Sequence, residues 1–91
     1  MKLTVSYSGM ARSVARTASE TFDLPAMTTL PDLLAQIAQR HGDKMAHLVT
    51  PAHDGLPSVL IFVGDEQVTW PSPPPLKDGD HIMLVSPIAG G

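Results

Sequence analysis

The sequence contains no cysteine, which excludes disulfides, thiolate metal sites and a cysteine nucleophile. Aromatic residues make up only 4% of the chain, and no apolar run approaches the roughly 20 residues that a membrane-spanning helix needs. Positive charge is not in excess either, because the formal net charge is −3 and no basic patch is present, which argues against nucleic-acid binding. Met1 and Lys2 lead directly into an alternating segment and not into the apolar stretch of a signal peptide, so we expect a cytoplasmic protein.

What is present is typical of one small globular domain, with 91 residues and an apolar fraction of 43%. We predict that the domain spans residues 1–86 and that residues 87–91 form a flexible C-terminal tail. The tail is thin, and ordering each of its residues would cost about 1–2 kcal/mol of backbone entropy.

The first third of the chain predicts two strands. Residues 2–8 alternate polar and apolar side chains with a period of two, as in a half-buried strand. Residues 10–15 have helical spacing over a single turn. Residues 17–24 are rich in threonine and predict a second strand, although Glu20 interrupts the alternation and leaves the register open.

One long helix is predicted from Leu30 to His41. Its apolar residues recur at the spacing of a single helical face; they are Leu30, Leu33, Leu34, Ile37 and Ala38. Thr28 or Thr29 can cap its start, and Gly42 is placed to end it. Residues 45–49 predict a further short helical turn.

The second half of the chain predicts three more strands. Residues 58–63 form the most apolar run, which favours a central strand buried on both faces. Gly64 and Asp65 suit a two-residue hairpin that leads into a return strand at 66–70. Residues 71–75 are a stiff proline-rich connector, 76–80 a turn and 81–85 the last strand. The order of elements predicts an α+β fold, with a mixed sheet of four to five strands packed on one main helix.

The last residues of the chain are unusual for the end of a small domain. Pro87 cannot donate to a sheet, so the last strand should end near it, and Ile88, Ala89, Gly90 and Gly91 follow. The two glycines form the slimmest peptide available, and Gly91 carries a free carboxylate with a reference pKa of about 3.5. We interpret this tail as a group to be modified in another protein's active site; the alternative is a frayed end.

The end of the chain resembles the C-terminal signature of the bacterial ubiquitin-like sulfur carriers; it consists of Pro75–Asp80, an apolar strand and Ser86–Gly91. This family includes the molybdopterin synthase small subunit and the thiamine-pathway carrier. This resemblance implies the ubiquitin-like β-grasp fold, with the first and last strands adjacent and parallel. It also implies that Gly91 is the site of adenylation and thiocarboxylate formation, and that Pro87 to Gly91 enter the active site of a partner.

The resemblance implies two partners. One is an adenylating enzyme of the ubiquitin-activating type, which uses ATP, and the other is a synthase such as the molybdopterin synthase large subunit. The chain itself would bind no cofactor and would not be an enzyme. A molybdopterin synthase small subunit is favoured; a carrier for thiamine or cysteine synthesis, a ubiquitin-like protein modifier and a non-covalent interaction module are the alternatives.

Other candidate sites have simpler interpretations. The histidines lack the spacing of a metal site, with His41 expected at a helix end and His81 on a strand edge; the four are His41, His47, His53 and His81. Asp78 and Asp80 flank a glycine, as turn residues do. Residues 71–74 match a minimal polyproline ligand but favour a rigid connector, and Arg12 and Arg16 favour a solvated face.

Overall fold

The computed structural model describes residues 1–50, 59–70 and 72–86. The predicted tail, residues 87–91, lies outside the described residues. The division of the chain at residue 86 and the flexibility of the tail therefore stay predictions.

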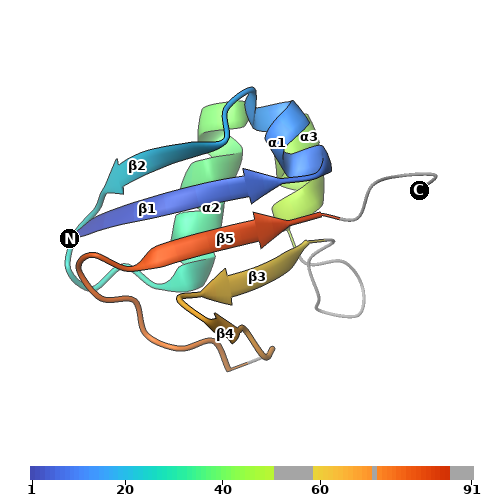
Figure 1. Cartoon of the computed structure of the whole chain (residues 1–91). Helices are drawn as coiled ribbons and strands as arrows, with labels where there is room; N and C mark the ends of the chain where they lie inside the picture. The colour runs from blue at the N-terminus through green and yellow to red at the C-terminus, as the bar shows by residue number, and fades with distance from the viewer. Residues whose placement is uncertain (51–58, 71, 87–91) are drawn as a thin grey trace.

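Five strands form one mixed sheet (Figure 1). They are β1 (Lys2–Ser8), β2 (Ser19–Asp23), β3 (Leu60–Val63), β4 (Glu66–Gln67) and β5 (His81–Val85), in the order β2-β1-β5-β3-β4. The first and last strands pair in parallel, with Val5 opposite Ile82, as the β-grasp resemblance implied. The other pairs are antiparallel.

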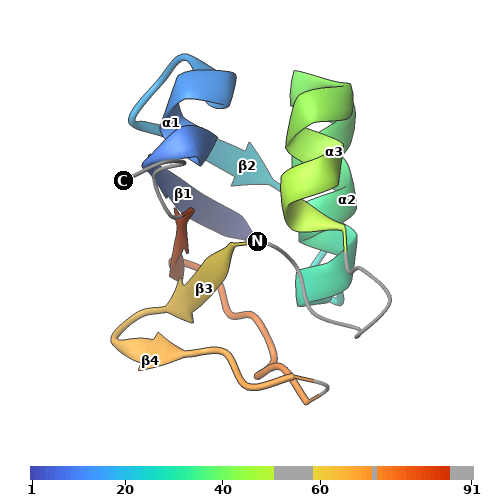
Figure 2. The same cartoon turned by 90° about the vertical axis from the view of Figure 1, so that its right-hand side faces the viewer.

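Two of the three helices, α2 (Leu30–His41) and α3 (Asp43–Val49), lie on one side of this sheet, and α1 (Met10–Ala15) lies at the end of β1 (Figure 2). Thr29 caps α2 through a capping box with Asp32, which confirms one of the two predicted caps. Gly42 ends α2 with φ at +95°, a conformation that favours glycine. The predicted main helix is therefore confirmed with its boundaries.

The core lies between α2 and the inward face of the sheet. Leu33, Leu34 and Ile37 are buried, as are the inward residues of the strands; these include Leu3, Val5, Phe22, Ile61, Ile82 and Leu84. Because strand residues alternate between the two faces, each strand contributes every second residue to this core.

The structure corrects the prediction that residues 58–63 are buried on both faces. Leu60 is 47% exposed and Phe62 is partly exposed, whereas Ile61 is buried. The reason is that the helices cover only one side of the sheet, so the outward residues of an apolar run remain at the surface. Residue 58 lies outside the described residues, and the strand begins at Leu60.

Three other boundaries differ from the prediction. The second strand begins at Ser19, because Arg16 takes a left-handed conformation and Thr17 bonds to the carbonyl of Ser19 in a turn. The return strand ends at Gln67, after which Trp70 packs against the core. The turn predicted at 45–49 is part of a seven-residue helix, α3, that starts directly after Gly42.

The packing of α2 gives a first prediction. Leu33→Ala should lower the free energy of unfolding by about 2–5 kcal/mol, because the lost side chain leaves a cavity between helix and sheet. Gln36→Ala, on the exposed side of the same helix, should change it by less than about 0.5 kcal/mol. Urea denaturation of both variants measures the difference, and equal small effects would contradict this placement of α2.

Candidate functional site

The last described residue, Ser86, is held against the junction of β1 and α1. It is 4% exposed and is the one buried polar residue in the described ranges. Its hydroxyl accepts the N–H of Ala11 at 2.7 Å and donates to the carbonyl of Ser8 at 3.3 Å. The predicted site residues follow it directly in sequence, so the residue that precedes them is fixed at the β1–α1 junction.

The predicted site residues themselves lie outside the described residues; they are Pro87, Ile88, Ala89, Gly90 and Gly91. Chain geometry still limits their reach. Five residues span at most about 16–18 Å when fully extended. The carboxylate of Gly91 can therefore act no farther than that from Ser86.

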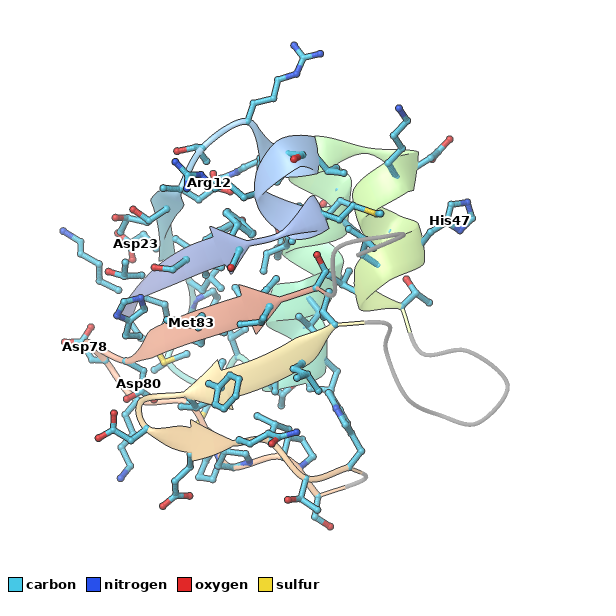
Figure 3. All side chains as sticks on the ribbon, turned by 45° about the vertical axis from the view of Figure 1, so that its right-hand side comes forward. Arg12, Asp23, His47, Asp78, Asp80 and Met83 are labelled. Atoms are coloured by element: carbon cyan, nitrogen blue, oxygen red, sulfur yellow. The ribbon has the colours of Figure 1, made fainter. Side chains whose placement is uncertain are left out.

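An apolar patch lies on the open face of the sheet, close to Ser86. Leu60 pairs with Val85 and Phe62 with Met83 across β3 and β5, so these four side chains point to the same side. Leu60 is 47% and Met83 40% exposed. Figure 3 shows Met83 on β5, in the middle of this face. Large contiguous apolar patches mark binding surfaces for other proteins, so these four side chains are a candidate docking surface.

A polar cluster around Glu20 lies on the other side of the molecule from the patch, between the sheet and α2. One oxygen of its carboxylate accepts hydrogen bonds from the hydroxyl of Tyr7 and Nε2 of His41. The other pairs with Arg40 at 3.0 Å, and the guanidinium of Arg40 lies 4.0 Å from the ring centre of Phe22. Glu20 breaks the alternation of the second strand because it faces these partners.

The cluster shifts two pKa values in opposite directions. Burial, together with the hydrogen bond to Glu20, raises the pKa of Tyr7 well above its ordinary value. Burial also opposes ionisation of Glu20, but the hydrogen bonds from Tyr7, His41 and Arg40 outweigh it and hold the pKa of Glu20 below its ordinary value. Glu20 is therefore ionised at neutral pH and joins three elements.

The three histidines in the described part of the chain do not form a cluster. His41 ends α2, as predicted, and His47 is exposed on α3 (Figure 3). His81 begins β5, a central strand, and contacts the hydroxyl of Ser6 at 2.6 Å, so its predicted place on a strand edge is wrong. His53 lies outside the described residues. In the described ranges no group of three histidine or carboxylate side chains could hold a metal ion.

The remaining candidates have structural roles where they are described. Asp78 accepts the N–H of Lys2, and Asp80 accepts the N–H of Lys77, which confirms both as turn residues (Figure 3). Arg12 and Arg16 are exposed. Pro71 lies outside the described residues, and 72–75 belong to neither helix nor strand. None of the helices in the described part of the chain is long and apolar enough to cross a membrane.

Comparison of the sequence with known protein families identifies the family of this chain. The sequence profile of the ThiS family matches residues 5–91. The chain belongs to the ThiS family. The predicted resemblance to the sulfur carriers is thus confirmed, and with it a sulfur carrier role and the ubiquitin-like β-grasp fold.

Two similar proteins are named as molybdopterin synthase or molybdopterin converting factor subunits. The chain is 32% identical to the molybdopterin synthase sulfur carrier subunit of Chlamydomonas reinhardtii over the full length of both. The structure of a Pyrococcus furiosus protein assigned as molybdopterin converting factor, subunit 1, is 30% identical and superposes with a TM-score of 0.76, covering 97% of this chain and 99% of that one.

A second structure shares the fold at lower identity. It is the complex of subunits 1 and 2 of the molybdopterin-converting factor from Helicobacter pylori. The matched chain in it is 21% identical to this chain and superposes with a TM-score of 0.55, and the match covers 100% of both chains.

Sequence reasoning missed three features of this site. The contacts of Ser86 and the partners of Glu20 join residues far apart in the chain, and no local pattern signals them. The apolar patch did have a signal, because Leu60 and Phe62 alternate with Ile61. That signal was hidden in a continuous apolar run.

The Glu20 cluster gives a second prediction. Because its pKa is lower in the folded chain than the unfolded value of about 4.3, ionised Glu20 stabilises the fold above that pH, and the contribution is lost as pH falls below it. Glu20→Gln should therefore cost about 1–3 kcal/mol at pH 7 and much less near pH 3.

Thermal and urea unfolding across this pH range measure the effect. Glu66→Gln is the matched control, since it makes the same chemical change on exposed β4 and should cost less than about 0.5 kcal/mol at either pH. A Glu20→Gln penalty that stays constant down to pH 3 would show that charge on Glu20 does not stabilise the fold.

Proposed function

We propose that the carboxylate of Gly91 is adenylated by an enzyme of the ubiquitin-activating type, converted to a thiocarboxylate and used as the sulfur donor of a molybdopterin synthase. The observation that carries the proposal is the short separation between the Gly90–Gly91 pair and the anchored Ser86. Ser86 is fixed to the domain beside an apolar patch, and Gly90 and Gly91 come only a few residues after it. The chain acts as a co-substrate, and catalysis belongs to its partners.

The chemistry proceeds in two steps that need no catalytic side chain on the carrier. A carboxylate oxygen of Gly91 attacks the α-phosphorus of ATP, and pyrophosphate leaves. A sulfur nucleophile such as hydrosulfide then attacks the acyl carbon; the C–S bond forms as the C–O bond to AMP breaks. The adenylate is required because a carboxylate oxygen is a poor leaving group until it is esterified to phosphate.

The apolar patch and the tail have separate tasks in this proposal. The patch holds the body of the carrier on a partner, while residues 87–91 extend into the partner's active site. Glycine at the last two positions suits a narrow channel, since it has no side chain to clash. The complex of subunits 1 and 2 in the Helicobacter pylori protein supports a synthase subunit as one partner.

The position of the carboxylate gives a third prediction. Adding one alanine after Gly91 should abolish adenylation, because it displaces the carboxylate by about 3.5 Å, far beyond the tolerance of a reacting pair. Each protein is incubated with the adenylating enzyme encoded in the same genome, ATP and hydrosulfide. Mass spectrometry should show oxygen replaced by sulfur at the C-terminus of the wild type alone.

Equal thermal unfolding midpoints of the two proteins serve as the control for folding. Thiocarboxylation of the extended chain without prior trimming would contradict the proposal. Isopeptide conjugates of the wild type in place of the thiocarboxylate would favour a protein modifier.

The patch gives a fourth prediction. Met83→Asp should weaken binding to the adenylating enzyme roughly 10- to 100-fold, because it places a charge at the centre of a surface that loses water on binding. Thr21→Asp adds the same charge to the open face on β2, two strands away from β5, and should change the dissociation constant by less than about twofold. Calorimetric titration compares the two; similar weakening by both would argue against the patch.

A further inference from the structure

Ser86 caps a helix to which it does not belong. The residue before α1 is Gly9, which has no side chain to cap the helix, and no other side chain near in sequence does so. The N–H of Ala11, at the second position of α1, instead donates to the hydroxyl of Ser86 at 2.7 Å, across 75 residues of sequence. An N-terminal amide of a helix needs an acceptor from outside the helix, and here the root of the tail supplies it.

Ser86 is held by its backbone as well as by its hydroxyl. Its N–H donates to the carbonyl of Ser8 at 3.3 Å, and its hydroxyl donates to the same carbonyl. The first bond continues the parallel pairing of β1 with β5 by one residue beyond the last strand. The N–H and the hydroxyl of Ser86 are thus both tied to the β1–α1 junction.

Gly9 leaves room for the carbonyl of Ser86, because it has no side chain. A Cβ atom at Gly9 would lie 2.1 Å from the carbonyl oxygen of Ser86 and 3.2 Å from its hydroxyl oxygen. Gly9 also has φ at +67°, which side chains disfavour. Because the blocking atom belongs to the backbone, it cannot move aside as a flexible side chain could. A side chain at position 9 would therefore displace Ser86 from the β1–α1 junction.

We propose that Ser86 and Gly9 form an anchor that sets the direction in which residues 87–91 leave the domain, and that both are positioning residues for the reaction at Gly91. This inference rests on the proposed function. The ring of Pro87 fixes its own φ near −65°, so two successive constraints aim the tail. The reach of the carboxylate is then measured from a fixed point.

Loss of the anchor should add Ser86 to the flexible tail and widen the range of positions that the carboxylate of Gly91 can take. If Ser86 is freed, its backbone must be ordered again whenever the tail enters a partner, and ordering one residue reduces the productive fraction roughly 5- to 30-fold. The apolar patch does not include Ser86, so docking of the body should be unaffected. The loss should therefore appear in kcat/KM for adenylation.

Ser86→Ala tests the anchor, because it removes the hydroxyl and keeps the backbone. ATP–pyrophosphate exchange with the adenylating enzyme from the same genome should show kcat/KM lowered roughly 2- to 10-fold, less than full release of Ser86 would give, because the bond from its N–H to Ser8 remains. Ser13→Ala is the matched control, since Ser13 is an exposed serine on α1 that is not among the hydrogen-bond partners given for Ser86, and it should behave as the wild type. Ser86→Cys keeps the size but bonds weakly, so it should show a smaller loss.

Amide exchange provides a readout that does not depend on activity. In Ser86→Ala the N–H of Ala11 loses its acceptor, and its exchange should become roughly 2- to 10-fold faster, with no change in Ser13→Ala. Wild-type adenylation and wild-type exchange in both Ser86 variants would overturn the anchor.

If the wild-type chain is not adenylated, the proposed function is refuted. The anchor is then tested by a measurement that needs no adenylation. Residual dipolar couplings of the amides of Ile88 to Gly91 then decide it. Couplings that differ between wild type and Ser86→Ala support the anchor, and identical couplings overturn it.

Discussion

The parallel pairing of β1 with β5 is the constraint on which the rest of this structure depends. It brings together two segments from opposite ends of the chain, with Thr4 opposite His81 and Ser8 opposite Val85. Parallel strands cannot be joined by a tight turn, so the intervening chain must cross over, and α2 lies in that crossover. The same pairing places the end of β5 beside the turn from β1 into α1. The contacts of Ser86 with Ser8, Gly9 and Ala11 follow from that placement.

Coverage of the sheet on one side only has a functional consequence. The helices bury Ile61, Ile82 and Leu84 on the inner face and leave their neighbours on the outer face exposed. The result is an apolar patch that meets water in the free chain, at the same end of β5 from which the tail departs. A partner that covers the patch gains apolar burial, and the short tail then has only about 16–18 Å in which to present its carboxylate. In the proposed function one strand, β5, therefore contributes to the patch and leads to the tail.

The Glu20 cluster holds α2 against the strands on the opposite side of the sheet. Its carboxylate joins Tyr7 of β1, His41 at the end of α2 and Arg40 one residue before, so a single side chain fixes the helix against the strands. A buried carboxylate is costly without partners, and here both oxygens have them. Tyr7 packs edge-on against His41 with ring centres 5.7 Å apart, which closes the cluster.

The sequence by itself determined the features that depend on neighbours in the chain. The spacing of Leu33, Leu34 and Ile37 with the cap at Thr29 defined α2, and the segments Pro75–Asp80 and Ser86–Gly91 indicated the family. The tertiary structure decided the rest, namely which face of residues 60–63 meets solvent, what Glu20 pairs with and what holds Ser86. Periodicity and capping are local, because they arise from backbone geometry within a few residues. The partner of Ser86 lies 75 residues away, and only the folded sheet brings the two together.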